Sequence, residues 1–243
     1  MQNLRSLTAG VEDRGVLPPG TNERFSGYGV MSLPFSSGHV LGLRRFPLTS
    51  VGPAYTSVWL RNPGGAWTIY TTVSPEFSCP RYFGDALEHT SMHDISIGWT
   101  SDRHFEVRID DDDVNLRWNV SLTARPVTRA MTAMMALIPG AGWRSAGFLR
   151  AMGIVAGPML GAGKVALTGK TPNQQQFFAS PKRIWFVQDS TAQLNGNDFG
   201  PLARLDVQDK LGDFWMPQRG IFMIGSAAFD PRDPVVHSAE APR

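Results

Sequence analysis

Side chains that could move a proton gather in one short stretch of the sequence, residues 82–94, which holds Tyr82, Glu88, His89 and His93. The two histidines are four residues apart, a spacing that puts both rings on one face of a helix and also on one face of a strand. Tyr82, Glu88 or His93 could act in proton transfer. The histidines could also bind a metal with a third ligand, or simply precede a strand at the surface. We expect no metal.

Two further carboxylates stand beside apolar segments. Asp189 follows the apolar residues 184–187, and Asp213 precedes Phe214 and Trp215. A carboxylate held in an apolar pocket has a raised pKa and can serve as a general acid, as the protonation of an alkene or an enol requires. The candidate catalytic residues are therefore Tyr82, Glu88, His93 and Asp189.

Two segments of this sequence partly match the motifs of phosphate and calcium sites, but neither match is complete. The glycine-rich residues 157–165 have the wrong spacing for a phosphate loop, and Val165 stands where a serine or threonine would hold magnesium. The aspartates at 110–113 lack the glycine and the distal glutamate of an EF-hand loop. No nucleophile elbow occurs. We therefore expect a protein without a bound cofactor.

Strands are the main elements available to position these residues. The turn residues 62–65 separate two β-like segments and predict a hairpin. The predicted strands are residues 28–33, 39–46, 56–61, 67–73, 94–100, 104–110, 114–123, 183–187, 204–208 and 220–229. Antiparallel strands with one apolar and one polar face are typical of a meander or a barrel wall.

The clearest pattern is the alternation of polar and apolar residues through 104–110 and 114–123, with the aspartates between them as the turn. We predict that Ile109 pairs with Val114. This register places Glu106 opposite Arg117 as an oppositely charged cross-strand pair.

Charge is unevenly distributed along the chain. Residues 114–188 contain no Asp or Glu and nine Lys or Arg, within a chain whose net charge is +2. In the middle of this stretch the apolar residues take helical spacing. One stripe is Met131, Met134, Met135 and Ile138, and the second is Phe148, Met152, Val155 and Met159. We predict a helical insert at residues 128–169.

The helical insert has three possible roles. Its methionine stripes could pack over one end of the barrel, where flexible side chains would make an adaptable lid for apolar ligands. Its apolar face and its cations, among them Arg129, Arg144 and Arg150, could instead lie on an anionic membrane surface. It could also be a contact between subunits. A nucleic-acid partner is not expected, because the aromatic residues are not interleaved with the cations.

Composition and the ends of the chain complete the domain prediction. At 243 residues and 42 % apolar content, one β domain can bury a sizeable core. We predict a flexible arm at residues 1–24, one barrel domain at 25–229 and a flexible tail at 230–243. A single cysteine, Cys79, excludes an internal disulfide and favours a reducing compartment. With no secretory signal and no span of about 20 apolar residues, we expect a cytoplasmic protein, with peripheral membrane association as the alternative.

The tryptophan-bearing strands at 57–60 and 66–70 and the hairpin at 104–123 resemble the lipocalin-like superfamily. More narrowly, they are similar to the carotenoid hydratase and AttH-like group, to which lipocalin-like cyclases and Diels–Alderases are related. The resemblance implies an antiparallel barrel with a cofactor-free pocket for isoprenoid, steroid, polyketide or other apolar molecules. It assigns no catalytic residues, and the helical insert departs from a simple barrel.

Two functions follow as hypotheses. The first is a cofactor-independent hydratase, isomerase or cyclase that acts on a lipophilic substrate. The second is a non-catalytic carrier of lipophiles or a membrane-associated binding protein. In both, large apolar side chains line the cavity; the candidates for substrate binding are Trp59, Trp118, Met134, Phe148, Trp185 and Trp215.

Overall fold

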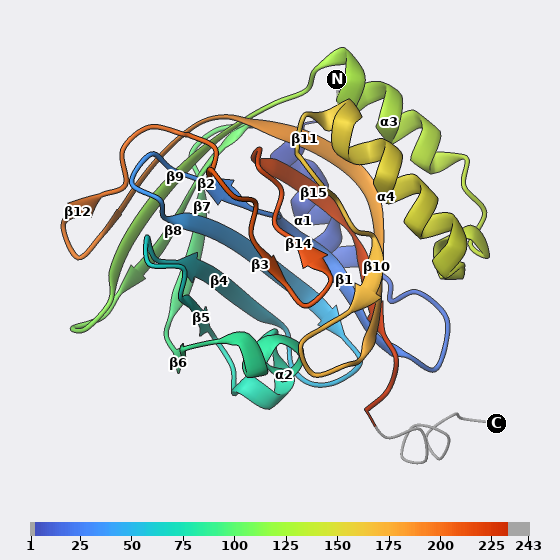
Figure 1. Cartoon of the computed structure of the whole chain (residues 1–243), viewed down its shortest axis with the longest axis horizontal. Coiled ribbons are helices and arrows are strands. Elements are labelled where there is room, and N and C mark those ends of the chain that lie inside the picture. Colours follow the sequence, from blue (N-terminus) through green and yellow to red (C-terminus); the bar gives the residue numbers. More distant parts are fainter. Residues whose placement is uncertain (1–2, 233–243) are drawn as a thin grey trace.

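The computed structural model of the protein describes residues 3–232. Most of its strands belong to one curled sheet (Figure 1). Its strands follow one another in the order β6-β5-β4-β3-β1-β15-β11-β9-β8-β7. The strands of this path are β1 (Glu23–Val30), β3 (Val40–Thr49), β4 (Tyr55–Arg61), β5 (Trp67–Thr71), β6 (His89–Met92), β7 (Ile95–Trp99), β8 (His104–Asp110), β9 (Asn115–Thr123), β11 (Gln176–Leu194) and β15 (Ile221–Phe229).

The two edges of this sheet are joined by only two residues. β6 lies at one edge and β7 at the other, and His93 and Asp94 connect them. The sheet therefore curls until β4 and β7 touch, which gives a half-barrel. All neighbours along the path pair antiparallel except β5 and β6, which pair parallel. The prediction of a mainly β, antiparallel, barrel-like fold is confirmed.

Short strands and helices complete the structure. β2 (Leu33–Pro34) pairs with β3, and β10 (Thr168–Lys170) and β12 (Asn197–Asp198) pair with β11. β13 (Lys210–Leu211) and β14 (Phe214–Trp215) form a separate hairpin. The helices are α1 (Leu4–Arg14), α2 (Pro80–Phe83), α3 (Pro126–Ala136) and α4 (Ala146–Leu160), with 3₁₀ turns η1 (Pro75–Phe77), η2 (Gly84–Ala86) and η3 (Gly142–Arg144).

Strands in the two halves of the sheet are buried differently. β8 and β9 alternate between buried and more exposed residues, as their sequences predict. β1 and β4 are buried on nearly every residue, because both of their faces are covered. Leu41 and Val58 belong to the core shared with β7–β9, whereas Val40 and Trp59 belong to a second core that includes α2. The central strands thus separate two apolar layers.

The hairpin of β8 and β9 has the predicted faces but not the predicted register. Ile109 pairs with Leu116 rather than Val114, a shift of two residues. Glu106 consequently lies opposite Asn119, and its ion pair is with Arg108, at 2.6 Å. Because side chains alternate with period two, a shift of two keeps every residue on its face. The predicted ion pair of Glu106 with Arg117 is wrong.

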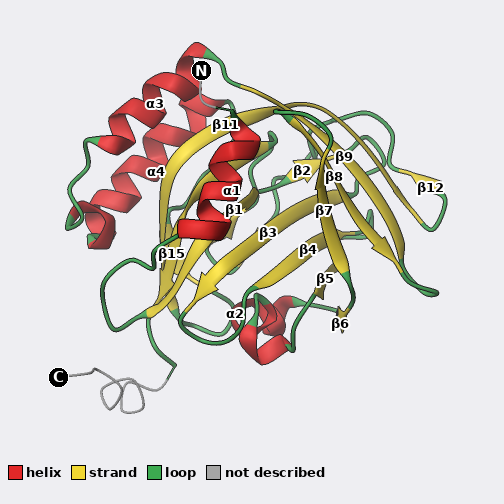
Figure 2. Ribbon diagram, turned by 180° about the vertical axis from the view of Figure 1, so that it is seen from behind, coloured by secondary structure: helices red, strands yellow, loops and turns green. Residues whose placement is uncertain are grey.

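The helical insert packs against the outside of the sheet. α3 and α4 lie side by side along β11 (Figures 1 and 2). The buried face of α4 is not the predicted stripe, and includes Gly153 and Gly157. A Cβ at these glycines would lie 2.6 Å from the Val165 carbonyl oxygen and 2.2 Å from that of Gly163. The glycines allow close backbone contact, which turns Val155 and Met159 toward solvent.

A helix lies inside the segment that was predicted as an N-terminal arm. Residues 4–14, inside the predicted flexible arm, form α1, which buries Leu4 and Thr8 and contacts β1 and β3. Residues 233–243 of the predicted tail lie outside the described residues. Among helices within residues 3–232, none combines the length and apolar character needed to cross a membrane.

Candidate ligand-binding pocket

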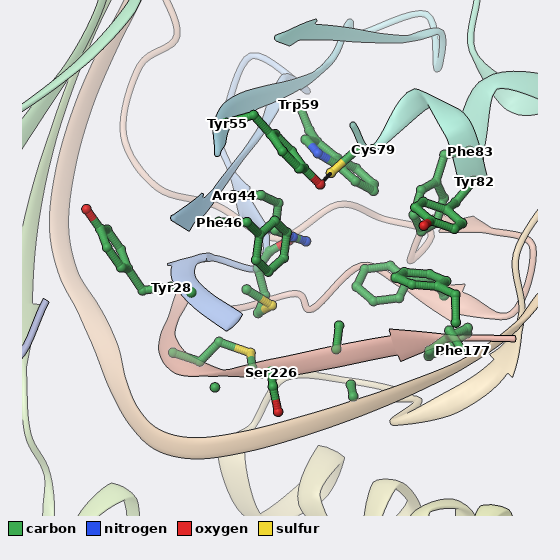
Figure 3. Close-up of a pocket in the computed structure, with 18 residues that line it drawn as sticks. Tyr28, Arg44, Phe46, Tyr55, Trp59, Cys79, Tyr82, Phe83, Phe177 and Ser226 are labelled. Atoms are coloured by element: carbon green, nitrogen blue, oxygen red, sulfur yellow. Dashed lines mark hydrogen bonds between the residues drawn. The ribbon is translucent and has the colours of Figure 1, made fainter. Parts of the chain in front are cut away.

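A cavity lies between the two sides of the curled sheet. β1, β3 and β4 contribute one wall, β11 and β15 contribute the opposite wall, and α2 and β14 close it. Figure 3 shows Arg44, Tyr55 and Trp59 on one side and Phe177 and Ser226 on the other. Within this cavity, the centre of a water molecule can occupy a volume of about 80 Å³. One water needs about 10–15 Å³ by this measure, so a small organic molecule fits.

Arg44 is the one charged side chain among the described residues that line this cavity. It is 5 % exposed. Its Nη1 donates to the carbonyl oxygens of Val30 and Leu43 at 2.5 and 2.9 Å, and its Nη2 donates to that of Met31 at 3.0 Å. The guanidinium carbon lies 4.9 Å from the centroid of the Trp59 ring. These contacts fix the guanidinium at the wall of the cavity.

No carboxylate forms an ion pair with Arg44 within residues 3–232. Burial lowers the pKa of this guanidinium to about 10, so it still carries its charge at neutral pH. Three of its five N–H groups are used, which leaves Nε–H and one Nη2–H. Nε and Nη2 form the edge of a guanidinium that binds a carboxylate in a two-pronged fashion.

Hydroxyl and thiol groups lie beside Arg44. Tyr55 Oη and Cys79 Sγ share a hydrogen bond of 3.4 Å, and Ser57 Oγ donates to the same sulfur at 3.3 Å. Burial raises the pKa of Tyr55 well above its ordinary value, and the neighbouring Cys79 raises it further. Tyr55 therefore stays protonated and can donate a hydrogen bond. The cluster combines a fixed cation, a neutral donor and a cysteine sulfur that accepts a hydrogen bond.

A buried ion pair anchors one end of the cavity. Glu23 is fully buried; it accepts from Arg81 Nη2 at 2.6 Å and from Tyr82 Oη at 2.5 Å. Burial raises the pKa of Glu23, but the bonds from Arg81 and Tyr82 outweigh it and the net shift is downwards. Tyr82 stacks on Phe229 with the ring centroids 3.8 Å apart. This network holds α2 against β1 and β15.

A second cavity lies between the helical insert and the sheet. About 100 Å³ of it is open to the centres of water molecules, and no charged side chain of the described chain lines it. Seven of the ten methionines do: Met31, Met131, Met134, Met135, Met152, Met159 and Met223. We call the first cavity the Arg44 pocket and the second the methionine cavity.

The four candidate catalytic residues lie apart in the structure. Tyr82 lines the Arg44 pocket. His93 is buried away from both cavities, with its Nδ1 2.5 Å from Asp111 and its Nε2 2.8 Å from Ser91. Glu88 and Asp189 are exposed and line neither cavity. Proton transfer by these residues therefore stays a prediction.

The six candidate substrate-binding residues are similarly divided. Trp59 lines the Arg44 pocket, and Met134 and Trp215 line the methionine cavity. Trp118 is in the core of the sheet, where its Nε1 donates to Ser190 at 2.9 Å. Trp185 borders another pocket beside α3, and Phe148 is a partly exposed residue of α4. The structure thus places three of the six at the two cavities.

Sequence reasoning did not select Arg44 or Tyr55. A signal for Arg44 was present, since Arg44 and Arg45 are adjacent in a predicted strand and must point to opposite faces. Arg45 meets Glu12 at the outer side, at 2.7 Å. Arg44 had to point to the other face, which the curled sheet covers.

Comparisons with known proteins assign no family. No protein-family model matches the sequence, and a comparison with curated proteins finds no match. A solved structure of similar shape is acetoacetate decarboxylase from Legionella pneumophila, with 8 % identity and a TM-score of 0.40. The alignment covers 86 % of this chain and 83 % of that chain. Within residues 3–232, no group of three His, Cys, Asp or Glu side chains is placed to hold a metal ion.

Proposed function

We propose that this protein binds a small apolar molecule that carries a carboxylate, and that the carboxylate lies against Arg44. The observation that carries the proposal is a buried guanidinium with two N–H groups directed to no protein partner within residues 3–232. Moving a charge out of water costs several kcal/mol unless it is paired. Three carbonyl oxygens offset part of this cost, and an anionic ligand would offset more.

The remaining lining restricts the rest of the ligand. Phe46, Phe83, Phe177 and Phe229 surround the space, and Phe214 lies over the guanidinium at 5.8 Å. Apolar and aromatic walls with few polar groups are typical of small-molecule sites. The polar part of the ligand would therefore be fixed at Arg44, with its apolar part against the aromatic rings.

We favour a cofactor-free enzyme over a carrier, because Tyr55 and Cys79 line the pocket and form a hydrogen-bonded cluster with Ser57 behind them. In an isomerisation, Cys79 would be the general base that takes a proton from the carbon next to a carbonyl group. Tyr55 would stabilise the enolate oxygen by donating a hydrogen bond, and the proton would return to a different carbon. Hydration and cyclisation, which the lipocalin-like resemblance implies, use the same kind of donor and remain within this proposal.

The experiment that tests ligand binding compares two probes that differ in charge. Hexanoate and hexanamide have the same length, and hydrogen bonds to a charged group contribute about 1.5–3 kcal/mol. We expect calorimetry to give a Kd for hexanoate that is roughly 10- to 100-fold lower. Equal affinities for the two probes would exclude Arg44 as an anion site.

A second experiment separates enzyme from carrier. An enzyme of the proposed kind exchanges the C3 protons of 2-oxohexanoate with D₂O, which proton NMR detects. The Tyr55→Phe variant should bind this keto acid but exchange its protons at least tenfold more slowly. Exchange at the uncatalysed rate with the unaltered protein would leave the carrier function.

The exposed surface of the insert favours one addition to the carrier hypothesis. Leu137, directly after α3, is 83 % exposed, and Ile154 of α4 is 75 % exposed. The exposed cations Arg129 and Arg150 lie on α3 and α4. Apolar residues flanked by cations suit an anionic bilayer surface. In that case α3 and α4 would contact the membrane from which a lipophilic ligand comes.

A further inference from the structure

The Arg44 pocket and the methionine cavity share part of their walls. Met31, Ala179, Phe214 and Met223 line both. Two of these four residues are methionines, whose unbranched side chains change rotamer more easily than branched or aromatic ones. The partition between the cavities is therefore thin, and movable side chains form half of it.

The two cavities have complementary chemistry. One holds a buried guanidinium, and the other is lined by apolar side chains throughout its described lining. Each has room for roughly five to ten water-sized groups. A molecule with an acid at one end and a chain of about ten carbons would fill both.

We propose that the two cavities form one site for a medium-chain amphiphilic carboxylate. The acid lies at Arg44, and the chain passes between Met31 and Met223 into the methionine cavity. This inference rests on the proposed function in one respect, the binding of the acid by Arg44. It adds the substrate class: flexible aliphatic or isoprenoid acids rather than short acids that fill the Arg44 pocket alone.

The methionine cavity also offers a route to the surface. Met134, Val155 and Met159 belong to its lining and are each about half exposed. The cavity therefore reaches solvent at α3 and α4. A ligand can enter there with its carboxylate first. Cations of residues 114–188, which contain no Asp or Glu, attract this carboxylate as it approaches; Arg129 and Arg150 are examples.

Chain length is the first test. Saturated monocarboxylates of four to fourteen carbons are titrated into the unaltered protein by calorimetry. Burial of one methylene contributes about 0.8 kcal/mol, so Kd should fall about fourfold per carbon up to about ten carbons and then level off. Affinity that stops rising at six carbons would overturn the proposal.

The second test fills the methionine cavity. Met152→Trp places a large side chain in its lining, and Ile154→Trp places the same side chain on the exposed face of α4. We expect Met152→Trp to weaken decanoate binding at least tenfold and to leave hexanoate binding unchanged, whereas Ile154→Trp changes neither. Equal effects of both variants, or no effect of Met152→Trp on decanoate, would contradict the shared site.

A third measurement uses the unaltered protein, so that it does not depend on the folding of a variant. Decanoate with a terminal diazirine is bound and irradiated, and the labelled peptides are identified by mass spectrometry. Labels should lie in residues 126–160. Labels confined to residues 79–83 would place the whole chain in the Arg44 pocket and overturn the proposal.

The two proposals fail in different ways. If decanamide binds as well as decanoate while Met152→Trp still weakens both, Arg44 does not bind the acid but the cavities are connected. If acids are preferred over amides at every length without a gain beyond six carbons, Arg44 binds the acid and the cavities are separate.

Discussion

The Arg44 pocket and the methionine cavity are of similar volume but differ in the side chains that line them. Aromatic residues form half of the first lining, and a charged group fixed by three bonds to carbonyl oxygens lies within it. Methionines and small aliphatic residues form most of the second, which α3 and α4 cover. A fixed polar group gives specificity, whereas flexible thioethers accommodate chains of different shape. The contrast suggests a site that selects strictly for the head group and loosely for the tail.

The ion pair that anchors the Arg44 pocket should have the largest effect on stability. Glu23→Gln removes a fully buried charge and leaves Arg81 without its carboxylate. We expect the free energy of unfolding to fall by about 3 kcal/mol, as for other buried pairs. Urea denaturation measures this. The matched control Glu12→Gln breaks the partly exposed pair with Arg45 and should cost about 1 kcal/mol. Equal losses would contradict a special role for Glu23.

The same ion pair predicts how stability depends on pH. The pKa of Glu23 is lowered in the folded protein, so its contribution is present above the pKa of the unfolded chain. Stability should therefore fall from about pH 5 downwards, as Glu23 becomes protonated. Glu23→Gln should flatten this part of the profile, which urea titrations at several pH values measure. An unchanged slope in the variant would assign the dependence to other groups.

Removing the cation tests the specificity of the Arg44 pocket. Arg44→Met should weaken hexanoate binding by about 100-fold, because truncating one partner of a buried charged pair costs 2–5 kcal/mol. Arg45→Met is the matched control, since it alters the next residue on the opposite face. It should leave hexanoate binding unchanged. If Arg44→Met loses stability but not affinity, Arg44 only supports the backbone at residues 30–31.

Stiffening the methionine cavity tests its tolerance. Met131→Leu and Met135→Leu together keep the apolar volume and should cost less than about 1.5 kcal/mol of stability. Branched leucines adapt less well, so binding of a branched isoprenoid acid should weaken several-fold more than binding of decanoate. Competition titrations with the two acids measure the ratio. An unchanged ratio would show that the methionines act only as packing.

The smallest predicted effect concerns the outer face of the insert. Each exposed cation near an anionic leaflet contributes about 1 kcal/mol, so Arg150→Gln should weaken binding to phosphatidylserine-containing liposomes about fivefold. Lys182→Gln, at an exposed position of β11, is the control. Sedimentation with liposomes at two salt concentrations measures both. Binding that ignores salt and Arg150 would contradict membrane contact by the helices.

Local patterns in the sequence determined most strands and the faces of β8 and β9. Alternation with period two assigns each residue to a face whatever the partner strand. The turn residues 62–65 likewise fixed the hairpin of β4 and β5, in which Arg61 pairs with Trp67. The register of β8 and β9 was not determined. Asn115 donates to Asp110 across the turn and to Asn195, which is 80 residues away, and the alternating pattern does not reveal either bond.

Tertiary structure alone decided which faces are covered and hence where the site lies. A strand pattern assigns residues to two faces but does not show what covers each face. Arg44 and Tyr55 become residues of a pocket only because the sheet curls over them. The predicted apolar stripe on α4 was wrong as its buried face for the same reason. Gly153 and Gly157 contact the backbone of residues 163–165 instead. The sequence alone did determine a β protein with a methionine-rich helical insert. Which side chains are buried depends on contacts across the whole chain, and these contacts placed Arg44 inside the pocket.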